Sequence, residues 1–363
     1  MSTVIVTGSG GLIGSECVRY FVEQGFDVVG LENDMRARFF GADASTAPTT
    51  RRLVEAYPTF RSLAIDIRDA DAVMRIVGEH RRDLALIVHT AAQPSHDWAA
   101  SDVQADFGVN ANGTLNLLEA ARKHRPDATF IFCSTNKVYG NRPNDLPLVE
   151  LDTRLELPEN HPYFAGIDTT MSIDRCMHSL FGASKAAADL LVQEYGRYFD
   201  MPTVCFRAGC LTGPAHAGAQ AHGFLSYLMR CAVTGERYTV FGYGAKQVRD
   251  NLHGADVVSA FSAFHRDPRA GAVYNLGGGR DSNCSMLEAI ASCERIVGHP
   301  MNVVLVDEAR TGDHRWWISD LAEFGRDYPE WKVRFGIEEI LTQIHETSVE
   351  RWSSAGEAAD GSR

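Results

Sequence analysis

The chain has 363 residues and a formal net charge of −12 at pH 7. Proteins that bind nucleic acid mainly through its phosphates usually carry a positive balance, so this charge argues against nucleic acid as a partner. A hydrophobic content of 45% with 23% charged residues is ordinary for a globular chain and excludes an intrinsically disordered one.

The first residues lead directly into a strand-like run, Val4–Thr7, without the basic and apolar regions of a secretory signal. No apolar run approaches the ~18 residues of a membrane span. The cysteines form no C-x-x-C pair and, in a chain of this length, are typical of buried thiols in a reducing compartment. We therefore expect a cytoplasmic protein with no membrane contact, no disulfide framework and no metal site.

Short β-branched runs alternate with amphipathic stretches in the first part of the chain. The predicted strands are Val4–Thr7, Asp27–Leu31, Ser62–Ile65, Ala85–His89, Thr129–Cys133 and Thr203–Phe206. The predicted helices are Leu12–Gln24, Ala70–His80, Ala111–His124 and Ala183–Phe199. Strands that are apolar on both faces and separated by helices predict an α/β fold with a doubly wound parallel sheet of Rossmann type.

The alternation becomes looser after residue 206. Helices are predicted at Gly223–Val233, Ser285–Val297 and Ile337–Trp352, and strands at Val273–Leu276 and Val303–Val306. We expect residues 1–206 to form the sheet domain, residues 207–352 a smaller mixed lobe interleaved with it, and residues 353–363 a disordered tail. Met35–Arg52 and Asn141–Met177 look like irregular insertions.

A glycine-rich turn follows the first predicted strand. Gly8, Gly11 and Gly14 stand at three-residue spacing, a pattern that permits a tight turn, a close approach to a pyrophosphate and close packing of helix on strand. The helix that begins at Leu12 and Ile13 offers free N–H groups to phosphate oxygens. The turn therefore predicts a dinucleotide site in residues 1–206.

The ends of the following strands carry further candidate cofactor residues. Glu32 follows the second strand, where a carboxylate accepts hydrogen bonds from the adenosine ribose hydroxyls and repels a 2′-phosphate, which favours NAD over NADP. After the third strand, Ile67 can support an adenine ring while Asp66 accepts a hydrogen bond from its amine. Three residues after the fourth strand let the cofactor lie close to the backbone: Ala91, Ala92 and Gln93.

Six segments together resemble a known family. They are Thr7–Gly14, Asp66–Ile67, His89–Gln93, Asn110–Thr114, Ser134–Gly140 and Gly182–Lys185. They resemble the extended short-chain dehydrogenase/reductases of the NAD-dependent epimerase/dehydratase family, and among these the CDP-paratose (CDP-tyvelose) 2-epimerases. The closer similarity also rests on the long insertion and on Phe206–Pro214. The resemblance implies a nucleoside-diphosphate sugar as substrate and a homodimer formed through Ala111–His124 and Ala183–Phe199.

The resemblance also implies a Ser or Thr, a Tyr and a Lys beside the nicotinamide, with Asn110 in a positioning role. Thr135 and Lys185 are present, but the position four residues before Lys185 is Phe181, whose ring cannot transfer a proton. Lys185 with a lowered pKa is one alternative proton acceptor. Other titratable candidates nearby in sequence are Asp174, Cys176, His178 and Tyr163.

Further residues are candidates for the substrate. Asn136 and Lys137 stand where the related 4,6-dehydratases carry an Asp-Glu acid–base pair, so dehydration is disfavoured. Arg249 and Arg310 lie in segments that in the family contact the diphosphate, and guanidinium groups suit phosphate oxygens. The predicted substrate residues are Asn136, Arg207, His222, Arg249 and Arg310.

These features predict an NAD-dependent sugar-nucleotide epimerase that transiently oxidises a ring hydroxyl. Two alternatives stay open: a sugar-nucleotide oxidoreductase with net hydride transfer, and an inactive protein that binds NAD or a sugar nucleotide. Phe181 favours the inactive protein, whereas the retained Thr135 and Lys185 favour an enzyme.

Overall fold

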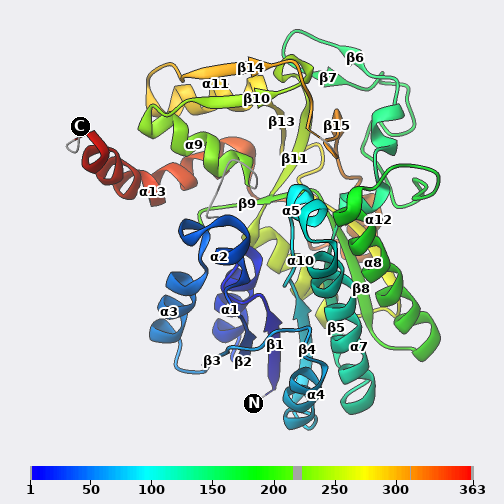
Figure 1. The fold of residues 1–363 in the computed structure, drawn as a ribbon. Coiled ribbons are helices and arrows are strands. Elements are labelled where there is room, and N and C mark those ends of the chain that lie inside the picture. Colours follow the sequence, from blue (N-terminus) through cyan, green and yellow to red (C-terminus); the bar gives the residue numbers. More distant parts are fainter. Residues whose placement is uncertain (1, 216–222, 311, 361–363) are drawn as a thin grey trace.

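A sheet of parallel strands forms the centre of the computed structural model, which describes residues 2–215, 223–310 and 312–360 (Figure 1). Within these residues the sheet has seven strands in the order β12-β8-β5-β4-β1-β2-β3. Their bounds are β1 Thr3–Thr7, β2 Asp27–Leu31, β3 Phe60–Leu63, β4 Leu84–His89, β5 Thr129–Thr135, β8 Thr203–Ala208 and β12 Ala272–Leu276. The strand order reverses between β1 and β4, the point at which open α/β sheets bind ligands. The predicted Rossmann-type sheet is confirmed.

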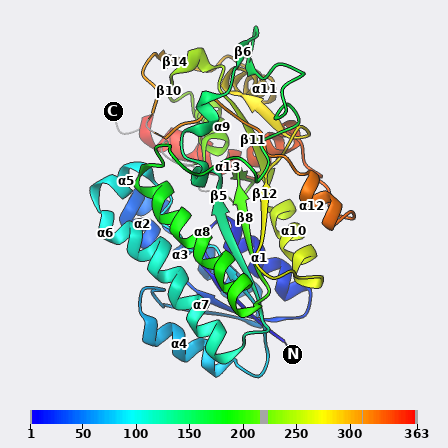
Figure 2. The ribbon, with the colours of Figure 1, turned by 90° about the vertical axis from the view of Figure 1, so that its right-hand side faces the viewer.

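Helices cover both faces of this sheet (Figure 2). Successive residues of β1 point to opposite sides: Val4 and Val6 belong to one core and Ile5 to the other. The first core is closed by α1 Leu12–Glu23, α3 Ala47–Ala56, α10 Gly254–Arg266 and α12 Ala322–Asp327. The second is closed by α4 Ala70–Glu79, α7 Gly113–His124 and α8 Ser179–Phe199. Burial on both faces explains why these strands are apolar throughout.

A smaller lobe stands above the carboxyl ends of the central strands in Figure 1. Its strands are β9 Cys210–Thr212, β10 Tyr238–Phe241, β11 Val248–His253, β13 Asn283–Ser285, β14 Val303–Val306 and β15 Trp316–Trp317. β10 pairs with β14, and β11 lies between β13 and β15. Its helices α9 Phe224–Thr234, α11 Met286–Val297 and α13 Ile337–Asp360 share one apolar core with β10.

The structure corrects three expectations from the sequence. The predicted strand Val273–Leu276 is not part of the smaller lobe, because β12 pairs with β8 at the edge of the central sheet. Met35–Arg52 is not irregular: α2 Met35–Phe40, the short 3₁₀ turn η1 Ala42–Ala44 and α3 cover it. Helix α13 extends to Asp360, within the stretch in which a disordered tail was expected.

The remaining elements are short. The insertion Asn141–Met177 contains the 3₁₀ turn η4 Arg142–Asp145 and the hairpin of β6 Val149–Glu150 with β7 Leu155–Glu156. Between β4 and α7 lie α5 His96–Ser101, α6 Val103–Phe107 and the π-helical turn η2 Gly108–Asn112. The 3₁₀ turns η3 Asn136–Tyr139 and η5 Tyr243–Ala245 follow β5 and β10. Among the described residues, none of the helices combines the length and apolar character needed to cross a membrane.

Candidate functional site

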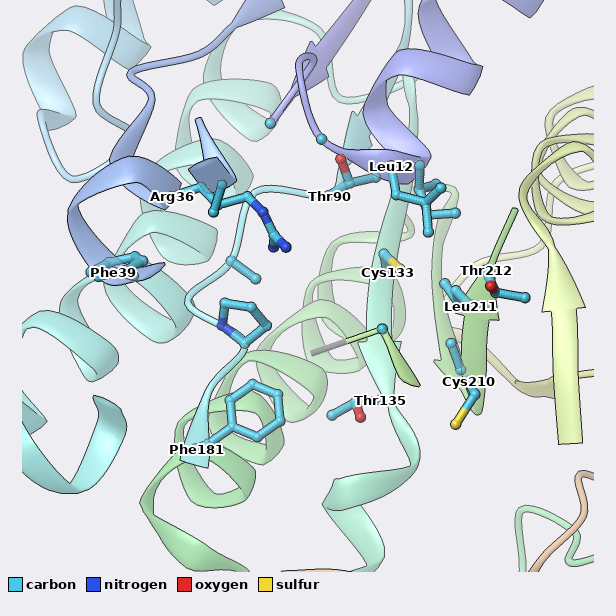
Figure 3. A pocket seen from close by; sticks show the side chains of 18 of the residues that line it. Leu12, Arg36, Phe39, Thr90, Cys133, Thr135, Phe181, Cys210, Leu211 and Thr212 are labelled. Atoms are coloured by element: carbon cyan, nitrogen blue, oxygen red, sulfur yellow. The ribbon is translucent and has the colours of Figure 1, made fainter. Parts of the chain in front are cut away.

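A cavity of about 530 Å³ lies between the central sheet and the smaller lobe. One end is lined by the glycine turn after β1 and by residues at the ends of β2 and β4. The other end is lined by residues at the end of β5 and after β8, among them Thr135 and Cys210 (Figure 3). Residues of β10 and β11 of the smaller lobe complete this end. The cavity therefore occupies the carboxyl ends of the strands at the switch in strand order.

The glycine turn forms the floor of the first end. Gly8 has a φ of +66°, and a Cβ there would lie 2.9 Å from the backbone of Ala91. A Cβ on Gly14 would lie 2.0 Å from the carbonyl oxygen of Gly8, so only glycine allows α1 to pack this closely. Helix α1 begins after Gly11 without a side-chain cap, and Leu12 and Ile13 of its first turn line the cavity. Backbone N–H groups of this turn thus face the space as an anion site.

Glu32 holds the adjoining rim. Its carboxylate accepts hydrogen bonds from the N–H groups of Gly10 at 3.0 Å and of Asp34 at 2.8 Å. Asp66 and Ile67 also line the cavity, and Arg68 binds both oxygens of Asp66. These residues lie at one end of the cavity, and their binding of an adenosine stays a prediction.

Helix α2 and the turn after it add lining residues that the sequence did not indicate. Arg36, Phe39 and Thr46 face the same end of the cavity, and Figure 3 shows Arg36 reaching into it. The Phe39 ring packs edge-on against Trp98 of α5 at 4.2 Å. The segment looked irregular in sequence, and only its tertiary placement reveals its role.

The loop after β4 divides the predicted cofactor residues into two groups. Ala91 and Ala92 line the cavity, as predicted. Gln93 and Asn110 do not line it, because both are buried beneath the loop. The Gln93 N–H donates to Asn110 Oδ1 at 3.0 Å, and Gln93 Nε2 donates to Asp106 at 2.8 Å. The predicted role of Gln93 and Asn110 in direct cofactor contact is therefore wrong, because both side chains hold the loop instead.

The middle of the cavity brings Thr135, Phe181 and Lys185 together. Figure 3 shows the Thr135 hydroxyl and the Phe181 ring reaching into the same region. Lys185 is buried one helical turn after Phe181 on α8 and donates from Nζ to the Cys133 carbonyl at 2.8 Å. Its Nζ also lies 4.0 Å from the centre of the Phe132 ring. Burial lowers the pKa of Lys185 to about 8.

Two titratable residues in this region were not among the predicted catalytic residues. His96, at the start of α5, packs edge-on against Phe181, with the two ring centres 5.1 Å apart. Its Nδ1 forms a hydrogen bond with the Ser179 hydroxyl at 2.7 Å. Burial lowers its pKa to about 4, so the ring is neutral at pH 7. Lys137 in η3 also lines the cavity and donates from Nζ to the Gly312 carbonyl at 2.9 Å.

Of the proposed substitutes for the missing phenol, Lys185 lines the cavity and the other four lie outside it. Asp174 is exposed, and the Cys176 thiol donates to the Tyr139 carbonyl of η3 at 3.4 Å. His178 pairs with the Cys176 carbonyl at 3.1 Å. None of the three lines the cavity, and neither does Tyr163. Nearness in sequence to Phe181 therefore does not place these side chains in the cavity.

The structure places only some of the predicted substrate residues at the cavity. Asn136, Arg249 and Arg310 line the cavity. Arg249 forms an ion pair with Asp313 at 3.5 Å, and Arg310 lies 4.3 Å from the centre of the Phe241 ring. Arg207 is corrected, since it is buried outside the cavity and bonds to Asp189 at 2.8 Å. His222 lies outside the described residues.

Comparison with known proteins identifies the family to which this architecture belongs. Residues 4–277 match the model of the "NAD dependent epimerase/dehydratase family". The chain belongs to this family. NAD is therefore its cofactor, and the glycine turn, where a Cβ would overlap the neighbouring backbone, fits a pyrophosphate while Glu32 fits the adenosine ribose.

Individual relatives within the family catalyse different reactions. The chain is 29% identical to CDP-paratose 2-epimerase from Salmonella typhi, over 97% of this chain and 99% of that protein. It is 27% identical to dTDP-glucose 4,6-dehydratase 1 from Escherichia coli strain K12, over 89% and 86%. The UDP-glucose 4-epimerase of Thermus thermophilus in complex with NAD has the same fold, with a TM-score of 0.75, 24% identity and coverage of 97% and 99%.

Proposed function

We propose that the protein is an NAD-dependent sugar-nucleotide epimerase of the CDP-paratose 2-epimerase type. The observation that carries the proposal is the pair Asn136–Lys137, which lines the cavity directly after Thr135. Elimination of water needs an acid and a base at the sugar, and an amide beside an amine does not supply a carboxyl pair. The full-length similarity to CDP-paratose 2-epimerase supports the same choice over a dehydratase.

The residues divide the work along the cavity. The glycine turn and Glu32 hold NAD, which when bound supplies reversible oxidation of a ring carbon without net redox change. Thr135 offers its hydroxyl to the sugar hydroxyl that is oxidised. Arg249 and Arg310 on the smaller lobe bind the diphosphate through charge-assisted hydrogen bonds. The sheet domain thus holds the cofactor and the smaller lobe the sugar nucleotide.

Two measurements test this proposal. Heat-denatured protein should release NAD, because a cofactor that is oxidised and reduced in each turnover stays bound. NAD-loaded protein should then convert one member of a panel of CDP-, UDP-, GDP-, ADP- and dTDP-linked sugars into its epimer, followed by NMR. Formation of a 4-keto-6-deoxy sugar from dTDP-glucose would replace the epimerase by a dehydratase, and absence of any NAD binding would end the proposal.

A second candidate is favoured by Phe181, which removes the phenol that the family uses. The protein would then be an inactive one that binds NAD or a sugar nucleotide. A sugar-nucleotide oxidoreductase with net hydride transfer stays open as a separate alternative. The same panel separates these outcomes. Net NADH absorbance at 340 nm indicates the oxidoreductase, whereas binding without conversion indicates the inactive protein.

We also propose a homodimer through α7 and α8 in the cytoplasm. Leu190, Tyr198 and Phe199 expose apolar surface on α8, whereas Leu118 and Ala121 of α7 are buried in the monomer core. The free cysteines suit a reducing compartment. Light scattering should give twice the chain mass, and a monomer at micromolar concentration would contradict the dimer.

A further inference from the structure

The site contains every part of an oxidising centre except the expected proton acceptor. Phe181 occupies the position of the family phenol, and its ring is buried against His96. A sugar hydroxyl cannot become a carbonyl unless its proton is taken up. The replacement must line the cavity beside Thr135 and Phe181 and must have a lone pair.

Most titratable groups that line the cavity do not meet these conditions. Glu32 and Asp66 lie at the adenosine end. Asp313 is paired with the Arg249 guanidinium. Burial raises the pKa of both cavity thiols, Cys133 and Cys210, so neither is a thiolate at neutral pH.

His96 and Lys185 are the nearer alternatives. His96 borders Phe181, but a pKa of about 4 makes its ring a weak acceptor for an alcohol proton. The Lys185 amine is directed toward the end of the sheet, where it donates to the Cys133 carbonyl and lies over the Phe132 ring. That position matches the family role of holding the cofactor ribose.

The backbone of Lys137 contacts Thr135 on one side and Gly182, next to Phe181, on the other. Its backbone N–H donates to the Thr135 hydroxyl at 3.3 Å. Its carbonyl oxygen packs closely on Gly182, the neighbour of Phe181: a Cβ on Gly182 would lie 2.9 Å from this oxygen. The backbone of this lysine is thus in contact with both sides of the site.

The side-chain amine of Lys137 lies near His96 and Phe181. Its Nζ donates to the Gly312 carbonyl at 2.9 Å. Gly312 packs on His96 so tightly that a Cβ would lie 2.7 Å from the imidazole, and His96 in turn contacts Phe181. The amine therefore lies next to the layer of side chains that covers the missing phenol.

We propose that the neutral amine of Lys137 accepts the proton of the sugar hydroxyl in place of the absent phenol. This assignment rests on the proposed epimerase function. The O–H bond of the sugar hydroxyl breaks and an N–H bond forms at Nζ. The hydrogen on the carbon that bears this hydroxyl leaves with both electrons of its C–H bond and passes as hydride to the bound NAD⁺. In the return direction the ammonium gives the proton back to the oxygen as the carbonyl is reduced, so atoms and electrons balance.

The surroundings of Lys137 favour the neutral amine. Burial, then the positive charge of Arg249, lower the pKa of Lys137 to about 8, against the opposing effect of Asp313. His96, Cys210 and His314 are the other titratable groups that face it. A sizeable fraction of the amine is free base near pH 8, and turnover should rise with pH through that value.

Two substitutions separate proton transfer from simple charge. Lys137→Arg keeps a cation that cannot lose its proton, and Lys137→Met removes the group. Both should lower turnover of the converted panel sugar by about a hundredfold or more at pH 8, the usual contribution of a general base. Bound NAD, and the Kd for CDP measured by calorimetry, should change by less than about threefold. Lys332→Arg, at an exposed position, is the matched control and should behave as wild type.

A second measurement does not depend on activity. In protein labelled with [6-¹³C]lysine, the NMR resonance that disappears in Lys137→Arg should titrate near pH 8. The chain has few lysines, which makes assignment direct: Lys123, Lys137, Lys185, Lys246 and Lys332. A pKa above 10 for this resonance would overturn the assignment.

The outcomes keep this assignment distinct from the proposed function. Conversion of a panel sugar that survives Lys137→Arg with more than a tenth of wild-type turnover overturns the assignment alone. A Lys137→Met protein that loses only affinity for the sugar nucleotide, with turnover intact, assigns the amine to phosphate binding instead. Absence of conversion by wild-type protein overturns both.

Discussion

The two ends of the cavity are built in different ways. The floor of the cofactor end consists of backbone and small residues: a turn at Gly8, the start of α1 after Gly11, and Ala91 and Ala92. The reaction and substrate end consists of side chains from α5, η3, α8, β11 and the segment around Arg310. A backbone site tolerates few changes of residue, because any added Cβ meets its neighbours, whereas a site made of side chains can exchange one acid–base group for another.

This difference accounts for Phe181. The loss of a phenol leaves the packing of α8 intact, since a phenylalanine ring fills nearly the same volume, and Phe181 remains buried against His96. Two lysines, Lys137 and Lys185, line the same space with lowered pKa values. The reaction end can therefore change its chemistry while the cofactor end remains fixed.

The largest effect is expected at the backbone end. Gly14→Ala places a Cβ 2.0 Å from the Gly8 carbonyl oxygen, so the turn or α1 must move. Affinity for NAD should fall by roughly a hundredfold, as expected from overpacking a tight contact. Calorimetry with NAD measures it, with circular dichroism to confirm folding. Gly325→Ala, where no atom lies within 4 Å of the new Cβ, is the matched control. Unchanged affinity in Gly14→Ala would show that the turn has room to relax.

A smaller and more selective effect is expected from Arg249→Met. Loss of a charge-assisted contact to a diphosphate costs about 2 kcal/mol, so KM for the sugar nucleotide should rise roughly thirtyfold while NAD affinity stays constant. Steady-state kinetics and calorimetry give the two numbers. Arg237→Met, at an exposed position of the same lobe, is the control and should leave KM unchanged. An equal loss of NAD affinity would mean that the two ends of the cavity are not independent.

The smallest effect is expected from Phe181→Tyr. If Lys137 transfers the proton, a restored phenol has no step to perform, and turnover should stay within about threefold of wild type. The double variant Phe181→Tyr/Lys137→Arg is more informative, because the phenol can then replace the lost amine and recover roughly tenfold over Lys137→Arg alone. A tenfold rise in the single variant would mean that proton transfer is deficient in the natural protein.

Much of the cofactor end could be predicted because its determinants are close in sequence. Gly8, Gly11 and Gly14 lie within one turn, and Glu32, Asp66 and Ala91 each follow a strand that the apolar pattern already marks. Gln93 and Asn110 belong to the same motifs, yet they hold the loop through buried hydrogen bonds instead of facing the cavity. A motif identifies a segment, whereas the direction of each side chain depends on what packs beneath it.

The side chains of the reaction end were harder to predict, because their positions depend on contacts between distant segments of the chain. Arg207 follows a predicted strand as Thr135 does, but a buried carboxylate at Asp189 binds its guanidinium and keeps it out of the cavity. Asp174, Cys176 and His178 are close to Phe181 along the chain but do not line the cavity. Conversely, His96 and Gly312 meet beside Phe181 from three distant segments.

The sequence by itself determined the sheet, the NAD turn, the absence of a phenol at position 181 and the family resemblance, because these depend on local periodicity, on glycine spacing and on single residue identities. Only the tertiary structure decided which titratable groups surround the reaction point. The physical reason is that burial and the neighbouring charges, which set both the position and the pKa of Lys137, arise from residues far apart in the chain.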